Sequence, residues 1–246
     1  MSQTRRIKCT VSYDGTNFFG FQKQVDKRTV QGEIEKCLST IHKEPCKIVG
    51  SGRTDAQVHA YGQVFHFDTH LDIKEENWKN ALNALLPNDI YIREVEKVDN
   101  EFHARYSVKK KEYRYYLTTA EYNPLRRNYI SFLKQDVDID KMREALKHFE
   151  GTHDFTSFTP TNNKVKDKVR TIYETHLNVH DKDLEFIFIG NGFLQYQVRI
   201  MMGLIIEIGL GKKEIELIDY LFEHHERFKA EYTAPPQGLY LWKVYY

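Results

Sequence analysis

The chain has 246 residues, of which 41% are hydrophobic and 13% aromatic, so it can build a real core in one large domain or two small ones. Its formal net charge is only +1, from 36 basic and 35 acidic residues. This balance excludes a surface that is positive throughout, although it allows a local basic face. The longest apolar stretch, residues 198–210, contains Arg199 and Glu207, so we expect no membrane-spanning segment.

The three cysteines, Cys9, Cys37 and Cys46, are odd in number and lack the CxxC spacing of metal sites. They predict reduced thiols in a cytoplasmic protein without a disulfide framework. Residues 1–6 lead straight into a strand pattern and contain no apolar block of a signal peptide, which fits the same location.

In the first half of the chain, hydrophobic positions switch between period two and period 3.6, the spacings of strands and helices. We expect strands at residues 7–13, 47–51, 63–68 and 90–95, and helices at residues 30–41 and 78–86. Thr29 is a suitable N-cap for the first helix, and Pro87-Asn88-Asp89 ends the second. This β-α-β-β-α-β order is the split βαβ, or ferredoxin-like, arrangement.

The second half of the chain repeats this order. We expect strands at residues 112–118, 170–179, 184–189 and 239–245, and helices at residues 139–149, 193–210 and 213–225. The predicted fold class is therefore α+β, with two ferredoxin-like halves at residues 1–105 and 106–246. Their sheets are expected to be largely antiparallel and joined around a central cleft, with helices on one face. Clefts between domains are favoured binding sites.

A charged loop is predicted at residues 50–60, where two glycines, Arg53, Asp55 and His59 stand between two hydrophobic runs. A carboxylate beside a guanidinium is expected to stay ionised, because the opposite charge lowers its pKa. An ionised carboxylate is what a nucleophilic aspartate requires. From the loop alone, an ordinary aspartate paired with Arg53 is the simpler interpretation, and the rest of the chain favours the catalytic one.

Two further residues stand out in the second half. Arg199 lies in an apolar predicted helix, so we expect it to be partly buried and to need an anionic partner. Asp55 and Glu207 are both candidates for that partner. Tyr113 lies in a predicted strand, either as a core tyrosine with a bonded hydroxyl or as a site residue that stacks on a base and relays a proton.

Basic residues gather in several short clusters, and tyrosines stand among some of them. The clusters fit solvated faces, or a phosphate track with stacking rings as in nucleic-acid grooves, and taken alone they favour neither. They are Lys109-Lys110-Lys111, Arg126-Arg127, Lys164, Lys166, Lys168, Arg170 and Lys212-Lys213.

Motifs for metals and nucleotide cofactors are absent from the sequence. His66 and His70 straddle a strand end, where they would not converge as they would on a helix, and no Cys/His set has zinc spacing. Gly50-Ser51-Gly52 lacks the third glycine of a dinucleotide fingerprint, and no serine stands in a nucleophile-elbow context. We therefore expect no bound metal and no cofactor.

Residues 52–60, GRTDAQVHA, closely resemble the GRTDAGVHA signature of the TruA family of tRNA pseudouridine synthases. Gln57 is the one departure, because the family pattern has glycine there. If that position has φ > 0, Gln57 is strained by about 1 kcal/mol. Further blocks extend the resemblance along the chain in the family's order: YDGTNF at 13–18 with GFQ at 20–22, FHARYS at 102–107, KEYRY at 111–115, HDFTSF at 153–158, GNGFL at 190–194 with Val198-Arg199, and APPQGLYL at 234–241. Tyr196-Gln197, before Val198, is a further variation on the family pattern.

The resemblance implies an enzyme that isomerises uridine to pseudouridine at positions 38, 39 and 40 of the tRNA anticodon stem-loop, without a cofactor and as a homodimer. It implies that Asp55 is the nucleophile, that Arg199 pairs with it, and that Tyr113 stacks on the target uracil and assists proton transfer. The substrate-binding residues that it implies are Tyr113, Arg53, Arg105, His59, Phe193 and Val198.

Two other functions are open from the sequence. One is a non-catalytic RNA-binding module of the same fold. The other is a metal-dependent hydrolase that uses Asp55 and His59.

Overall fold

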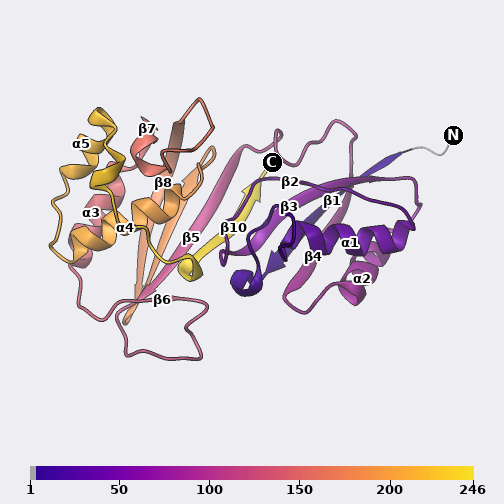
Figure 1. Cartoon of the computed structure of the whole chain (residues 1–246), viewed down its shortest axis with the longest axis horizontal. Helices are drawn as coiled ribbons and strands as arrows, with labels where there is room; N and C mark the ends of the chain where they lie inside the picture. Colours follow the sequence, from indigo (N-terminus) through magenta and orange to yellow (C-terminus); the bar gives the residue numbers. More distant parts are fainter. Residues whose placement is uncertain (1–3) are drawn as a thin grey trace. The chain divides into compact units, whose positions relative to one another are not determined.

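The computed structural model describes residues 4–246, which form two compact α+β units with largely antiparallel strand pairing, the fold class that the sequence predicts (Figure 1). The first unit contains the described residues up to Lys109 together with Leu241–Tyr246, and the second is Lys110–Tyr240. The expected division kept residues 106–246 together. The observed division differs from this expectation at the C-terminal end, because strand β10 (Leu239–Tyr245) is hydrogen-bonded to β3, a strand of the first unit.

The first unit has the expected β-α-β-β-α-β order. Its strands lie in the order β4-β1-β3-β10, with β2 also paired to β3, and β1 is antiparallel to both β3 and β4. The elements are β1 (Arg5–Tyr13), the 3-10 turn η1 (Gly15–Asn17), α1 (Val30–His42), β2 (Val49–Gly50), β3 (His59–Thr69), α2 (Glu75–Leu85) and β4 (Ile90–Val98).

Helices α1 and α2 pack together against the sheet of this unit. The side chain of Thr29 accepts a hydrogen bond from the Gly32 N–H over 3.2 Å, which confirms it as the N-cap of α1. At the other end of α1, the His42 ring stacks on Trp78 of α2, with centroids 5.5 Å apart. Trp78 in turn meets Phe67 of β3 edge to face at 5.2 Å. This aromatic contact joins both helices to the strand that follows the charged loop.

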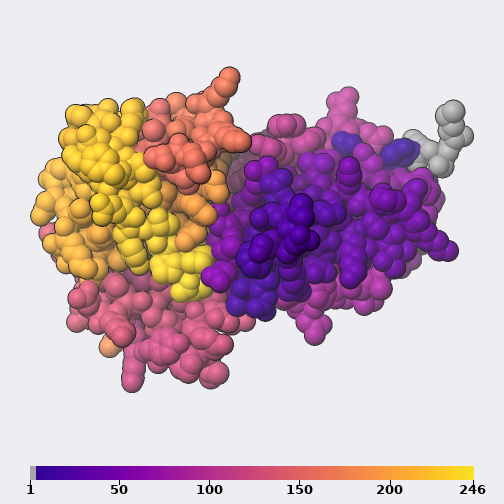
Figure 2. Space-filling view, in the orientation of Figure 1, coloured from indigo at the N-terminus to yellow at the C-terminus, as the bar shows by residue number. Residues whose placement is uncertain are grey.

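The second unit contains a sheet in the order β5-β9-β8-β7, with β6 parallel to β5. Figure 2 shows that α5 and the segments after it share one face of this unit with the segment between β5 and α3. The elements are β5 (Lys110–Thr118), β6 (Ser131–Phe132), α3 (Ile139–His148), β7 (Gly151–Asp154), η2 (Thr156–Phe158), β8 (Val169–His180), β9 (Asp183–Gly190), α4 (Gln197–Gly209), α5 (Leu217–His224), η3 (Arg227–Lys229) and η4 (Pro236–Gly238).

Three predicted boundaries were wrong. Helix α4 begins at Gln197 rather than at residue 193, because Tyr196 has a φ of 60° and this left-handed residue interrupts the helical backbone. Helix α5 begins at Leu217 rather than at residue 213. The strand predicted at 47–51 is only the pair Val49–Gly50, because only these two residues form a ladder with β3.

The three cysteines are buried free thiols, as the sequence predicts. Burial raises the pKa of both Cys37 and Cys46 to about 11. Within residues 4–246, none of the helices is both long enough and apolar enough to cross a membrane.

Candidate active site

The loop between β2 and β3 carries Asp55 and Arg53 at the surface of the first unit. The Asp55 side chain is half-buried and that of Arg53 is exposed. The loop begins at buried Ser51, whose hydroxyl donates to the side-chain oxygen of Gln63 over 2.5 Å. Gln63 also donates to the Gly52 carbonyl over 3.1 Å. A buried side chain of β3 therefore holds the start of the loop, while the acidic and basic side chains remain accessible to solvent.

The segment after β1 holds the middle of the same loop. The Phe21 N–H donates to the Thr54 carbonyl over 3.1 Å, and the Gln57 N–H donates to the Phe18 carbonyl over 3.2 Å. These two bonds flank Asp55 in the sequence. In addition, the Tyr13 hydroxyl lies 2.7 Å from the hydroxyl of buried Thr54. Fixed backbone on both sides limits where the carboxylate can lie, which a positioned nucleophile requires.

Two glycines allow this close approach of the segment to the loop. A Cβ atom at Gly15 would collide with the Val58 carbonyl. Gly20 has a φ of +87°, and a Cβ atom there would lie 2.6 Å from the Thr54 carbonyl oxygen. Both positions require glycine, because any side chain would displace the loop that carries Asp55.

His59 lies beneath the loop and is only 2% exposed. Its Nδ1 atom accepts a hydrogen bond from the Gly15 N–H over 3.0 Å and lies 3.3 Å from the Asp14 carboxylate. The same carboxylate accepts from the Thr16 N–H and so caps η1. The position of His59 suits a support for the loop and not a direct contact to a large substrate.

Gln57 has a φ of 65°, in the left-handed region that glycine adopts at little cost. Gln57 therefore has the positive φ at which a side chain strains the backbone, and the expected strain is about 1 kcal/mol. The side chain of Gln57 is exposed, so the loop keeps its hydrogen bonds while the glutamine points to solvent.

In the second unit, Tyr113 on β5 and Phe193 before α4 form an aromatic pair. Their ring centroids are 5.1 Å apart and the rings are inclined at 76°. Tyr113 is 8% exposed, and it lies opposite Phe188 of β9 in the sheet. The Tyr113 ring is therefore held from the side by Phe193 and anchored in the strand ladder.

Arg199 lies in the first turn of α4 and is half-buried, as the sequence predicts. Its Nε donates to the Ala234 carbonyl over 2.8 Å, and the Ala234 N–H donates back to the Arg199 carbonyl over 2.9 Å. Its guanidinium carbon lies 5.1 Å from the Tyr196 ring centroid. Val198, the preceding residue, is buried in the core at 3% exposure. The hydrogen bond from Nε therefore holds the Arg199 guanidinium in place.

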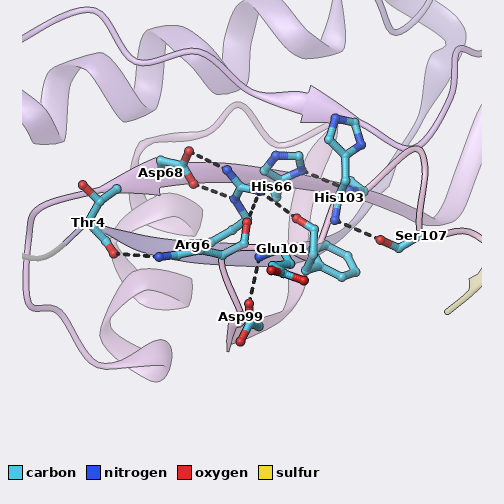
Figure 3. Close-up of polar contacts among 11 residues, drawn as sticks. Thr4, Arg6, His66, Asp68, Asp99, Glu101, His103 and Ser107 are labelled. Carbon is cyan, nitrogen blue, oxygen red and sulfur yellow. Dashed lines mark hydrogen bonds and ion pairs between the residues drawn. The ribbon is translucent and has the colours of Figure 1, made fainter.

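Arg105 lies in a turn at residues 104–106 of the first unit, which the sequence did not mark as a built feature. Arg6 binds Asp68 through two hydrogen bonds of 2.7 and 2.8 Å and also donates to the Phe102 carbonyl over 2.9 Å. The next residue but one, Ala104, donates its N–H to His66 Nδ1 over 3.1 Å. Figure 3 shows Arg6 and Asp68 beside His66, with His103 next to it.

His66 and His70, which were considered as metal ligands from the sequence, line a pocket together with His42, Glu44 and Asp68. In the described part of the chain, residues 4–246, no group of three or more such side chains could hold a metal ion.

The candidate site residues fall into two sets by unit. Those of the first unit are Arg53, Asp55, His59 and Arg105, and those of the second are Tyr113, Phe193, Val198 and Arg199.

Comparison with known proteins gives a consistent result. The model of a family described as tRNA pseudouridine synthase matches residues 10–107 and 145–246. The chain is 55% identical over 245 residues to the tRNA pseudouridine synthase A of Geobacillus sp. (strain WCH70), covering 99% of each. It is 53% identical to that of Anoxybacillus flavithermus (strain DSM 21510 / WK1), covering 98% of this chain and 99% of the relative. Among solved structures, the archaeal box H/ACA sRNP Nop10-Cbf5 complex matches 82% of this chain and 42% of its own at 18% identity, with a TM-score of only 0.35.

Proposed function

Because the chain belongs to the tRNA pseudouridine synthase family, we propose that it isomerises uridine to pseudouridine in tRNA, at positions 38, 39 and 40 of the anticodon stem-loop. The observation that carries this proposal is the GRTDAQVHA loop, whose Asp55 is solvent-accessible while backbone hydrogen bonds on both sides hold its position. The three positions follow from the resemblance of the loop and the other blocks to the TruA family.

In the proposed reaction, a carboxylate oxygen of Asp55 forms a transient covalent bond to the uracil ring or to ribose C1′. The N1–C1′ glycosidic bond breaks, the uracil turns, a C5–C1′ bond forms, and the bond to Asp55 breaks and returns the free carboxylate. The C5 proton is lost and N1 gains one, so the atoms balance and no oxidant, reductant or cofactor is consumed. The target nucleotide must leave the helical stack before the carboxylate can reach it.

We assign to Arg199 the role of pairing with Asp55 and keeping it ionised. Its half-buried position and fixed Nε support this role, since a partly buried guanidinium needs an anion. Glu207 is the other candidate partner. Its Oε2 atom is buried and makes no hydrogen bond to any residue from 4 to 246, so this oxygen does not bind Arg199.

Tyr113 is assigned to stack on the target uracil and to assist proton transfer at C5, with Phe193 holding its ring. Arg53 and Arg105 are exposed, and we assign them to the RNA backbone or to the space that the flipped nucleotide leaves. His59 and Val198 are buried, and we assign them to support of the site. We further propose that the protein acts as a cytoplasmic homodimer.

The test is release of tritium from tRNA labelled at uracil C5, with the wild-type chain and with Asp55→Asn. We expect the wild type to release label and Asp55→Asn to release none, while both bind tRNA equally. Release by Asp55→Asn would remove Asp55 from the mechanism.

The same assay separates the alternatives. Binding of tRNA without release by the wild type would favour the non-catalytic RNA-binding module. Loss of activity on prefolded tRNA after chelation, restored by one transition metal only, would favour the hydrolase.

A further inference from the structure

We propose that Tyr106, backed by His103 and flanked by Arg105, is a stacking platform for an unpaired nucleotide of the tRNA other than the reacting uridine. The proposal rests on tRNA being the substrate, and it deepens that function by assigning a second contact to the RNA. Tyr106 is 78% exposed. Single exposed rings are common on protein surfaces, so the role of this ring depends on how its surroundings hold it ready for a ligand.

The ring of Tyr106 is held from one side. It stacks on the His103 imidazole, with centroids 4.3 Å apart and planes inclined at 28°. His103 is fixed in turn, because its Nδ1 accepts the N–H groups of both Arg105 and Tyr106, over 3.1 and 3.2 Å. The His66 ring meets His103 edge to face at 5.0 Å. One face of the Tyr106 ring is therefore supported by a second ring, and the high exposure leaves the other available to a base.

The backbone beneath the ring is built into the core of the first unit. Ala104, at the start of the turn, is completely buried. Its N–H donates to His66 Nδ1, and its carbonyl accepts from the Tyr246 hydroxyl over 2.6 Å. His103 and Ser107 close the turn, since the Ser107 N–H donates to the His103 carbonyl and the Ser107 hydroxyl accepts from the His103 N–H.

The contacts of Arg6 complete the support. Its guanidinium binds Asp68 through two hydrogen bonds and donates to the carbonyls of Asn100 and Phe102 (Figure 3). The positive charge of Arg6 is therefore paired with Asp68 within the protein. Such a rigid turn loses little conformational entropy when a ligand binds, which is what a binding platform requires.

The chemistry of the platform favours a nucleotide. A flat ring with one open face stacks on any base, and a neighbouring guanidinium supplies charge for the phosphate. The Arg105 guanidinium carbon lies 5.9 Å from the Tyr106 ring centroid, so both groups can reach a single nucleotide. Duplex bases are covered by their neighbours, so the base on the platform is unpaired, as in an RNA loop.

The experiment measures the dissociation constant of the full-length chain for an unmodified tRNA transcript over a range of salt concentrations. Stacking on one aromatic side chain changes affinity by about 5- to 150-fold. We expect Tyr106→Ala to weaken binding at least about fivefold at every salt concentration, without a change in the slope of log Kd against log salt. Tyr106→Phe, which keeps the ring, should bind within about twofold of the wild type. Arg105→Ala should lower the slope by about 1.

A matched control is Tyr122→Ala, because Tyr122 is also an exposed tyrosine, at 57%, that contacts a second ring, Phe132, at 5.1 Å. It should leave tRNA binding unchanged. Wild-type affinity in Tyr106→Ala would overturn the platform, and so would a Tyr106→Phe variant as weak as Tyr106→Ala. A change in sedimentation mass of Tyr106→Ala would show that a second copy of the chain, and not RNA, covers the ring.

These outcomes are separate from the fate of the proposed function. If the wild type releases label from tRNA and Tyr106→Ala binds normally, the platform alone is wrong. If the wild type binds tRNA without releasing label, isomerisation is wrong, while the Kd values still decide whether Tyr106 stacks on RNA.

Discussion

The backbone N–H of Gly15 donates a hydrogen bond to Nδ1 of buried His59 over 3.0 Å. Nδ1 therefore acts as an acceptor in the structure. The bond ties the segment after β1 to the first residue of β3, the strand that directly follows the loop that carries Asp55. The position of Asp55 depends on packing by glycines and a histidine that need not touch the substrate.

Substitution of Gly20 tests this dependence. Gly20→Ala adds a Cβ atom 2.6 Å from the Thr54 carbonyl oxygen and places a side chain at φ +87°. We expect it to lower the free energy of unfolding by at least about 2 kcal/mol and to reduce pseudouridine formation. Urea denaturation and tritium release measure the two effects.

The matched control is Gly211→Ala, since Gly211 also has a positive φ, of +67°, but nothing lies within 4 Å of its added Cβ. It should cost only about 1 kcal/mol, from backbone strain, and leave the reaction rate unchanged. Equal costs for the two variants would contradict a packing role for Gly20.

Removal of the Tyr113 hydroxyl tests the proposed proton transfer. Tyr113→Phe keeps the ring against Phe193, so tRNA affinity should stay within about twofold of the wild type. The rate should fall by about 100-fold or more, the usual contribution of a positioned acid or base. Single-turnover tritium release with saturating enzyme measures the rate.

Tyr116→Phe is the control for this experiment, because it removes a tyrosine hydroxyl from the same strand, β5, one that donates to Glu185 over 2.9 Å. It should react at the wild-type rate. A Tyr113→Phe variant that is equally fast would leave Tyr113 only a stacking role.

Gln57→Gly tests the strain in the signature loop. Glycine adopts the observed φ of 65° without steric cost, which returns about 1 kcal/mol, but it also makes the unfolded chain more flexible, at a cost of similar size. We expect the free energy of unfolding to stay the same or rise slightly. Gln57→Ala keeps the strained Cβ and should show no gain. If Gln57→Gly lost more than about 1 kcal/mol in urea denaturation, the glutamine side chain would have a stabilising contact.

The stability of the first unit should depend on pH through His66. Burial, aided by the charges of Arg6 and His103, lowers its pKa from 6.5 to about 4. Below pH 6.5 the unfolded chain therefore binds a proton at His66 that the folded chain does not bind until the pH reaches about 4. The contribution of His66 to the free energy of unfolding is complete above pH 6.5 and falls by up to about 3 kcal/mol as the pH drops to 4.

His66→Asn isolates this effect, because an asparagine oxygen can still accept a hydrogen bond but does not titrate. The difference in unfolding free energy between the wild type and the variant should narrow between pH 6.5 and 4. A difference that stays constant over this range would mean that His66 becomes protonated without cost in the folded state.

Local signals in the sequence predicted much of this structure. Strand β1 was predictable because only one of its faces is buried, and α1 because Thr29 caps it. The start of α4 was not, because the left-handed Tyr196 depends on tertiary contacts and has no glycine to mark it. Strands β6 and β7 have two and four residues, too few to show a period.

In the candidate site, too, local motifs were predictable from the sequence and contacts between distant residues were not. The signature marked Asp55 directly, since a motif of adjacent residues is visible in one sequence. The support of the turn at residues 104–106 was not visible, because His66 lies 38 residues from Ala104 and Tyr246 lies 142 residues from it. Hydrogen bonds between such distant residues are set by the sheet, which brings β3 and β10 together.

The membership of Leu241–Tyr246 in the first unit has a consequence during synthesis. A nascent chain that has emerged from the ribosome as far as Tyr240 already contains all of the second unit, but its first unit still lacks most of the strand that hydrogen-bonds to β3. The unit that is translated first is therefore completed last. Until then, the edge of β3 that pairs with β10 has unpaired backbone groups.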